Sequence, residues 1–175
     1  MAHKIEYHAK SNAGSITGFD EIDKNAPLPA EQTSIFSGLK YKVTENVERP
    51  SFANPEVMEK VTALRFLFGT KDANGNQVLV QTREFKLSFH PKSNLVSFLS
   101  SWLGKPLPTD GSLTLDDFIG KGAQLTISHA QTRRGTTYAQ ISGIAPVITE
   151  LQDKVQPLNS FKLNAEEVAS EEDPY

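Results

Sequence analysis

The sequence contains no cysteine, which excludes a disulfide framework and a thiolate metal site. It also has no run that approaches the roughly 18 apolar residues of a membrane-spanning helix, and residues 1–10 contain no apolar stretch. We therefore expect a protein without membrane contact that works in the cytoplasm. With 175 residues, of which 38% are hydrophobic, the chain is long enough for one domain of ordinary size and too short for two.

Patterns typical of catalytic and metal sites are also missing. Four histidines without the spacing of metal ligands occur in the chain, His3, His8, His90 and His129. Residues 120–122, Gly-Lys-Gly, lack the preceding glycine and the following serine or threonine of a phosphate-binding loop. Asp116 and Asp117 are neighbours on an expected helical turn, so they point in different directions and do not form an acid–base pair. We expect a protein that is not an enzyme and that has no catalytic residue, metal or cofactor.

The most distinctive segment is the acidic C-terminal end, residues 165–175, which has five carboxylates and no lysine or arginine. It contains Glu166, Glu167, Glu171, Glu172 and Asp173 and ends in Pro174 and Tyr175. Without these five, 16 acidic residues remain against 18 Lys and Arg, so residues 1–164 have a net charge of about +2, although the whole chain has −3. A mildly basic body can bind polyanions while an acidic tail competes for the same surface. The simpler interpretation is a disordered, solubilising tail.

Alternating hydrophobicity predicts a mainly β domain over residues 34–150. It follows an irregular arm, residues 1–33, in which Ile16, Phe19 and Ile22 are expected to lie on the domain. Residues 151–164 are expected to form a linker and residues 165–175 a disordered tail. Each predicted strand has apolar residues on one face: Leu39, Tyr41 and Val43; Leu64, Phe66 and Phe68; Phe85, Leu87 and Phe89; Leu125 and Ile127; Ala139 and Ile141.

One segment changes to a period of 3.6 residues and predicts a helix. Leu95, Leu99 and Trp102 belong to its apolar stripe, with Ser93 as the cap and Gly104 just after the end. A short helical turn is expected at residues 115–119, opened by Thr114 and closed by Gly120. Polar, glycine-containing segments at residues 72–76 and 131–135 predict two hairpin turns.

The predicted order of elements is a strand, a hairpin, a helix and a second hairpin. This is the order of the five-stranded OB barrel, in which the helix lies between the third and fourth strands. Other small barrels and rolls also have five strands and one helix. The pattern therefore predicts an OB-like barrel and does not exclude the other small barrels and rolls.

Three runs of residues resemble a known family. Residues 85–105, 117–127 and 135–141 are similar to bacteriophage-encoded proteins related to OB-fold single-stranded DNA-binding proteins. The resemblance covers roughly residues 35–147. It implies an OB barrel, single-stranded DNA binding, a location in the host-cell cytoplasm, and a tail that recruits replication or recombination proteins through Glu171, Glu172, Asp173, Pro174 and Tyr175. The family's well-studied bacterial members end in Phe, whereas this chain ends in Tyr175.

A protein that binds single strands needs cations near the phosphates and exposed aromatic rings for the bases. The candidate residues are Lys40 and Lys42 on the outer face of the first strand, Arg65 and Lys86 on the next two, Arg49 and Phe52 in the first loop, Arg133 and Arg134 at the last hairpin, and Tyr138 beside it. A single cation of this kind is more often a solvated residue that protects a sheet edge. Only the set as a whole therefore argues for DNA binding. Tyr41 and Trp102 share the parity of the core and are expected to be structural.

Two functions follow from these residues. The first is a protein that coats and protects single-stranded DNA with little sequence preference in phage replication or recombination. Such a protein can work as a monomer or as a homo-oligomer. The alternative is an OB-like protein-interaction module, for example a phage factor that binds a host protein. The distribution of the cations distinguishes them, because one continuous concave strip favours DNA and a scattered arrangement favours the interaction module.

Overall fold

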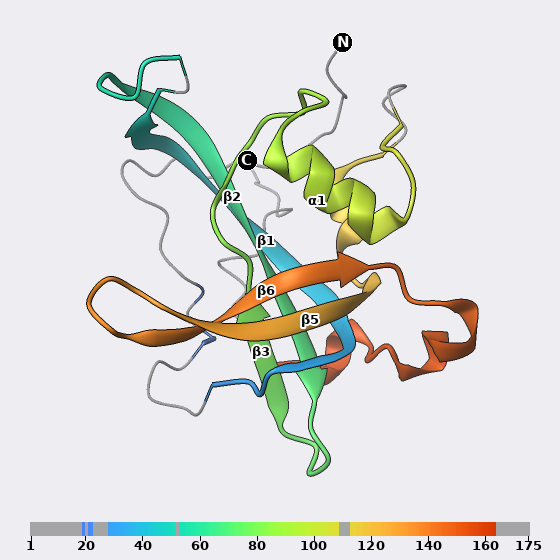
Figure 1. Ribbon diagram of the computed structural model, residues 1–175. Helices are drawn as coiled ribbons and strands as arrows, with labels where there is room; N and C mark the ends of the chain where they lie inside the picture. Colours follow the sequence, from blue (N-terminus) through green and yellow to red (C-terminus); the bar gives the residue numbers. More distant parts are fainter. Residues whose placement is uncertain (1–18, 20, 23–27, 52, 109–112, 164–175) are drawn as a thin grey trace, which may run out of the picture.

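The computed structural model describes residues 19, 21–22, 28–51, 53–108 and 113–163. The fold is mainly β, with one antiparallel sheet of six strands and few helices (Figure 1). The strands are β1 (Gln32–Pro50), β2 (Met58–Lys71), β3 (Gln77–Gln81), β4 (Phe85–Lys86), β5 (Gly122–Gln131) and β6 (Thr137–Ala145). The helices are α1 (Asn94–Leu103) and the short 3-10 helices η1 (Leu115–Phe118), η2 (Thr149–Lys154) and η3 (Leu158–Ser160). None of the helices in the described residues is long and apolar enough to span a bilayer.

Strand β1 joins the two halves of the sheet. The strand order is β3-β2-β1-β5-β6, with β4 also paired to β2. The first part of β1, residues 32–37, pairs with β5, and the remainder pairs with β2. The two pairings meet at Ser37, and a bulge at Leu39 follows just after, because Gly38 lies opposite Phe68 while Lys40 lies opposite Leu67. In Figure 1, β5 and β6 consequently cross over the long β1–β2 hairpin.

The mainly β prediction is confirmed, but the sheet is not closed into a barrel, whereas the sequence predicted a five-stranded OB-like barrel. Within the described residues, no strand pairs with the outer edge of β6 or of β3. The expected third strand is also broken at residues 82–84. There the Thr82 hydroxyl accepts a hydrogen bond from the Phe66 amide at 3.0 Å and donates one to the Arg83 carbonyl at 2.8 Å. The Phe66 amide thus bonds to a side chain in place of a backbone carbonyl, while the Thr82 amide still donates to the Phe66 carbonyl at 3.0 Å and β4 resumes the pairing with β2 at Phe85.

The main hydrophobic core lies between the sheet and α1. Leu64, Phe66 and Phe68 are fully buried, as their alternation predicts, and Leu125 and Ile127 join them. Trp102 packs on Phe68 with ring centroids 4.9 Å apart and donates to the Gly122 carbonyl at 2.9 Å. Tyr41 is buried and donates to Asp116 at 2.7 Å, so both aromatic residues are structural as expected.

The predicted helix and turns are confirmed. Ser93 caps α1 by accepting from the Val96 amide at 3.1 Å, and Gly104 adopts a left-handed φ of 77° just after its end. Thr114 and Asp117 form a capping box at η1. In the first hairpin, the Asp72 carboxylate accepts from the Asn74 and Asn76 amides, each at 2.9 Å.

A second, smaller core covers the opposite face of the sheet. Phe19, Leu39, Leu67 and Phe161 are buried together there. The predicted contact of the arm is confirmed for Phe19 and for the partly buried Ile22, whereas Ile16 lies outside the described residues. Leu39 was expected beside Tyr41, but the bulge turns it to this second face.

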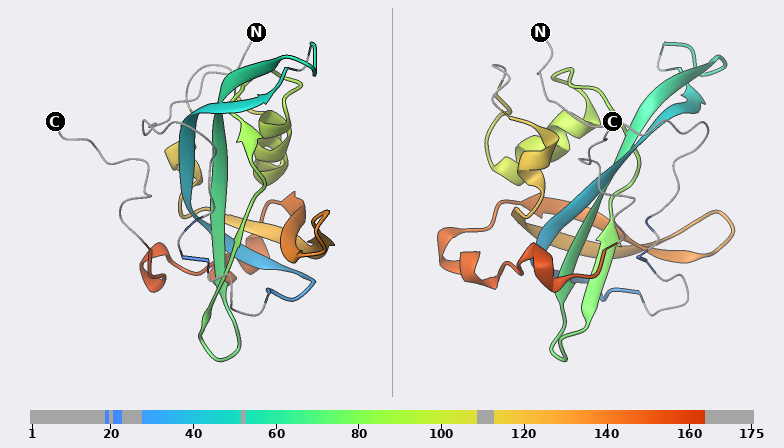
Figure 2. Two further views of the ribbon diagram at one scale, coloured as in Figure 1. Left: turned by 90° about the vertical axis from the view of Figure 1, so that its left-hand side faces the viewer. Right: turned by 180° about the vertical axis from the view of Figure 1, so that it is seen from behind.

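The segment expected to be a linker also packs on this face. Residues 149–163 carry η2 and η3 and run across the back of the sheet (Figure 2). Ser37 donates to the Gln156 carbonyl at 2.7 Å and Lys71 donates to the Ser160 carbonyl at 2.6 Å. The centre of the Phe161 ring lies 5.0 Å from the Lys71 ammonium group, which adds a cation–π contact. The described part of the chain beyond residue 150 therefore belongs to the domain.

Gly38 allows the closest packing between β1 and the core, which leads to a test. A methyl group at Gly38 would lie 2.7 Å from the Phe118 carbonyl oxygen and 2.7 Å from the Trp102 ring. We predict that Gly38→Ala lowers the free energy of unfolding by about 1–3 kcal/mol, because a backbone atom and a buried ring must both shift. Urea denaturation measures the loss.

Gly143→Ala is the matched control, since its methyl group would meet only Thr126, at an ordinary 3.5 Å. Its expected change is within about 0.5 kcal/mol. Similar losses for the two variants would contradict a special role of Gly38.

Candidate functional site

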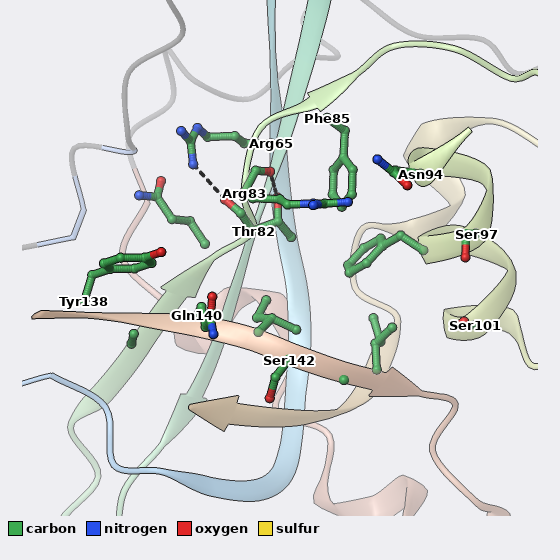
Figure 3. Close-up of a pocket in the computed structure, with 16 residues that line it drawn as sticks. Arg65, Thr82, Arg83, Phe85, Asn94, Ser97, Ser101, Tyr138, Gln140 and Ser142 are labelled. Carbon is green, nitrogen blue, oxygen red and sulfur yellow. Dashed lines mark hydrogen bonds between the residues drawn. The ribbon is translucent and has the colours of Figure 1, made fainter. Parts of the chain in front are cut away.

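A concavity of the described structure lies at the open seam of the sheet. It is a cleft of about 750 Å³ between the segment that joins β3 to β4, the exposed side of α1, and β6 (Figure 3). Residues 138–144 of β6 form one wall, and residues 81–83 with Phe85 form the facing wall. Its size is typical of small-ligand sites, and both of its long walls are sheet edges without a partner strand in the described residues.

The floor of the cleft is apolar. Phe98, Ile141 and Ile144 are partly buried against the main core and line the cleft. Phe85 packs on Phe98 with ring centroids 5.0 Å apart and rings tilted by 44°. The α1 side adds the small polar side chains of Asn94, Ser97 and Ser101, so that α1 presents no charge to the cleft.

Two arginines line the facing wall. Arg65 comes from β2, and one of its guanidinium nitrogens donates to the Thr82 carbonyl at 2.8 Å. Arg83 follows Thr82 and places its guanidinium carbon 5.3 Å from the centre of the Phe85 ring. Burial lowers the pKa of Arg65 from its ordinary value, and the nearby Glu84 carboxylate offsets part of this effect. Arg65 remains cationic at any physiological pH.

The side chains that line the cleft include positive charges and no negative charge, although the Glu84 carboxylate, which is not part of the lining, lies close enough to act on Arg65. Among the described residues, the 16 that line the cleft include no aspartate and no glutamate. The nearest acidic residue in sequence, Glu84, instead lies 4.0 Å from Arg49. The cleft can therefore accept an anionic ligand that also has a flat apolar part.

Two of the predicted site residues meet in this cleft. Arg65 and Tyr138 both line it, and Tyr138 is 42% exposed, in agreement with its predicted outward parity. Arg133 and Arg134 are exposed in the hairpin turn that leads into β6, next to the Tyr138 end of the cleft. Figure 3 shows Tyr138 at one end of β6, with Gln140 and Ser142 further along the wall.

Lys40 and Lys42 lie elsewhere. Lys40 was expected on a solvated face, but it is 1% exposed and its ammonium group lies 2.5 Å from the Glu21 carboxylate. The Phe19 ring covers both side chains, with its centre 5.6 Å from the Lys40 ammonium and 5.9 Å from that of Lys42. The prediction that Lys40 is a solvent-facing DNA contact is wrong, because the arm and the second core cover this face of the sheet.

The remaining candidates lie outside the cleft. Arg49 belongs to β1 rather than to a loop and lies beside Glu84. Lys86 points outward as predicted, and its ammonium group lies 3.3 Å from the Glu59 carboxylate. Phe52 and the tail residues Glu171, Glu172, Asp173, Pro174 and Tyr175 lie outside the described residues. The predicted cations thus occupy several faces and do not form one continuous strip.

Arg83 was not among the predicted site residues, although it lines the cleft. In the sequence it is one of two cations between Gln77 and Phe89, where the expected third strand shows a regular alternation that hides the break at residues 82–84. The Thr-Arg-Glu run before Phe85 is a weak signal for such a break.

Among the described residues, no group of three or more histidine, aspartate or glutamate side chains is placed to hold a metal ion. In comparisons with known proteins, no family model, curated sequence or solved structure matches the chain. The geometry of the cleft is therefore the basis for assigning a function.

The buried Lys40–Glu21 pair allows a test of the correction above. We predict that Glu21→Gln lowers the free energy of unfolding by about 3 kcal/mol, because it removes the negative charge that faces the buried Lys40 ammonium group. The double variant Lys40→Met/Glu21→Leu should recover most of that loss. Urea denaturation measures both.

Glu150→Gln, at an exposed position of η2, is the control for removing one negative charge and should change the stability little. If Glu21→Gln and Glu150→Gln were equally stable, the ion pair would not be a stabilising contact of the fold.

Proposed function

We propose that the protein binds single-stranded DNA with little sequence preference, and that the strand lies in the cleft at the open seam of the sheet. The observation that carries this proposal is an acid-free cleft with two arginines, an exposed tyrosine and a phenylalanine floor. In the same proposal the domain is an OB-type fold whose seam is open, and its role is to coat and protect single strands during phage replication or recombination.

The chemistry of the ligand supports this choice. A single strand presents phosphates at regular intervals and bases with exposed flat faces, so its sites combine cations with stacking surfaces. In the cleft, Arg65 and Arg83 supply the charge, and Tyr138 supplies an exposed ring. Arg133 and Arg134 continue the cationic surface beyond the Tyr138 end. Electrostatic contacts of this kind are independent of sequence and sensitive to salt.

The proposed site is narrower than the one expected from the sequence. Lys40 lies in a buried ion pair, and Lys42 lies beside Phe19 on the opposite face of the sheet. Lys86 and Arg49 each lie near a glutamate. A footprint centred on Arg65, Arg83 and Tyr138 therefore replaces a track along the outer faces of three strands.

The alternative, a protein-interaction module, is favoured by one observation. The cleft lies between two sheet edges that have no partner strand in the described residues, and an extended peptide can pair with such edges. The scattered cations also agree with this alternative. DNA is preferred because two arginines line the cleft without an acid, whereas strand pairing alone requires no such charge.

Fluorescence anisotropy of a labelled oligothymidine of about 30 nucleotides, long enough for one OB-sized site, tests the proposal. We predict salt-sensitive binding by the full chain. Arg65→Ala should weaken it several-fold and reduce the slope of log Kd against log salt by about 0.7, the value for one lost phosphate contact on a single strand.

Lys154→Ala is the charge-matched control, because Lys154 is exposed in η2 and does not line the cleft. It should leave the slope unchanged. If the full chain did not bind at low salt, the protein-interaction module would replace the DNA-binding proposal.

The acidic tail gives a separate prediction, since five carboxylates can compete with phosphates for the same cations. A chain that ends at residue 164 should bind the oligonucleotide more tightly than the full chain, with the larger difference at low salt. The same anisotropy titration measures it. Loss of DNA binding in the shortened chain would contradict competition by the tail.

A further inference from the structure

Arg83 occupies an unusual position in the cleft. It lies in the break between β3 and β4, where the chain is held by the Thr82 hydroxyl through its hydrogen bonds to Phe66 and to the Arg83 carbonyl. Thr82 is 2% exposed, whereas Arg83 is exposed. A rigid, buried residue therefore positions an exposed cationic side chain on the wall that faces β6.

The guanidinium group of Arg83 contacts an aromatic ring, that of Phe85, and forms no ion pair with a carboxylate of the described residues. Its carbon lies 5.3 Å from the centre of the Phe85 ring, and Phe85 packs on Phe98 at 5.0 Å. Within the described residues, no carboxylate or carbonyl accepts a hydrogen bond from the Arg83 guanidinium. The three side chains form a continuous ladder from α1 to the cleft, and Figure 3 shows Arg83 and Phe85 side by side on the wall opposite β6.

This geometry differs from that of Arg65. Arg65 is anchored to the Thr82 carbonyl and is partly buried, so it acts as a fixed point of positive charge. Arg83 has one planar group supported by an aromatic ring, which is the arrangement by which arginine stacks on flat ligands. The apolar floor beside it, Phe98 with Ile141 and Ile144, favours a base over a phosphate at this place.

We propose that Arg83 is a stacking platform on which one base of the bound strand lies inside the cleft, and that it is not primarily a phosphate contact. The inference rests on the proposed DNA-binding function and assigns a chemical role to one residue of that site. Asn94, whose amide lines the same cleft, can donate to or accept from the edge of the stacked base. An amide that offers both a donor and an acceptor does not select one base, which agrees with little sequence preference.

The comparison of Arg83→Lys with Arg83→Ala distinguishes stacking from charge. Lysine keeps the charge and loses the plane. If Arg83 is a platform, both variants should weaken binding of the oligothymidine by about 5- to 150-fold, the equivalent of one stacked base. The salt slope of Arg83→Lys should equal that of the unchanged protein. Arg49→Lys, in β1 and outside the cleft, is the matched control and should bind as the unchanged protein does.

A strand of the same length made of abasic nucleotides provides the second measurement. It retains the phosphates and offers no base to stack. The unchanged protein and Arg83→Lys should bind this strand equally, because the contact that distinguishes them is missing. Thermal unfolding of each variant confirms that it is folded before binding is compared.

The possible failures are separable. If the unchanged protein does not bind the oligothymidine at low salt, the proposed function fails together with this inference. If it binds and Arg83→Lys binds equally well, or if Arg83→Lys weakens binding to the abasic strand by the same factor, only the stacking role of Arg83 is overturned.

Discussion

The arrangement of the whole sheet depends on the packing of Gly38 in β1. Its amide donates to the Lys121 carbonyl at 2.9 Å, and its carbonyl accepts from the Gly120 amide at 2.7 Å, so its backbone bonds to the loop before β5. The Trp102 ring and the Phe118 carbonyl occupy the space where a side chain would lie. One strand can therefore turn from β5 to β2 without losing its hydrogen bonds. The position of β6, and with it the width of the seam, follows from this bend.

The second core covers one face of the sheet, whereas the seam stays open to solvent. On one face, the arm and the segment that carries Phe161 cover the sheet, so the lysines of β1 serve the fold. At the seam, residues 81–83 face β6 across the cleft, and Phe98 of the core is partly exposed there. Under the proposed function, a cation can contact the bound strand only if it lies at the seam. Cations therefore differ in role by position: Lys40 of β1 stabilises the fold, whereas Arg65 and Arg83 line the cleft.

Local signals in the sequence predicted the elements, and non-local packing decided the rest. The helix between Ser93 and Gly104 and the turn at Asp72 could be predicted because caps and turns depend on neighbouring residues. Alternation correctly placed Phe66 in the core and Tyr138 outside. It failed at Leu39, which a one-residue bulge turns to the second face, and it placed Lys40 on the correct face without revealing that Phe19 of the arm covers it. It also missed Arg83, whose position depends on a hydroxyl that replaces a backbone partner.

The shared strand also has a consequence for synthesis on the ribosome. The first part of β1 has no partner until β5 emerges, since Ser34 pairs with Leu125, about 90 residues later. At typical elongation rates of 5–20 residues per second, this delay lasts about 5–20 s. Residues 32–37 contain no charged side chain that would discourage pairing with another nascent chain. The bend that organises the finished fold therefore leaves this uncharged segment without its strand partner for that time during translation.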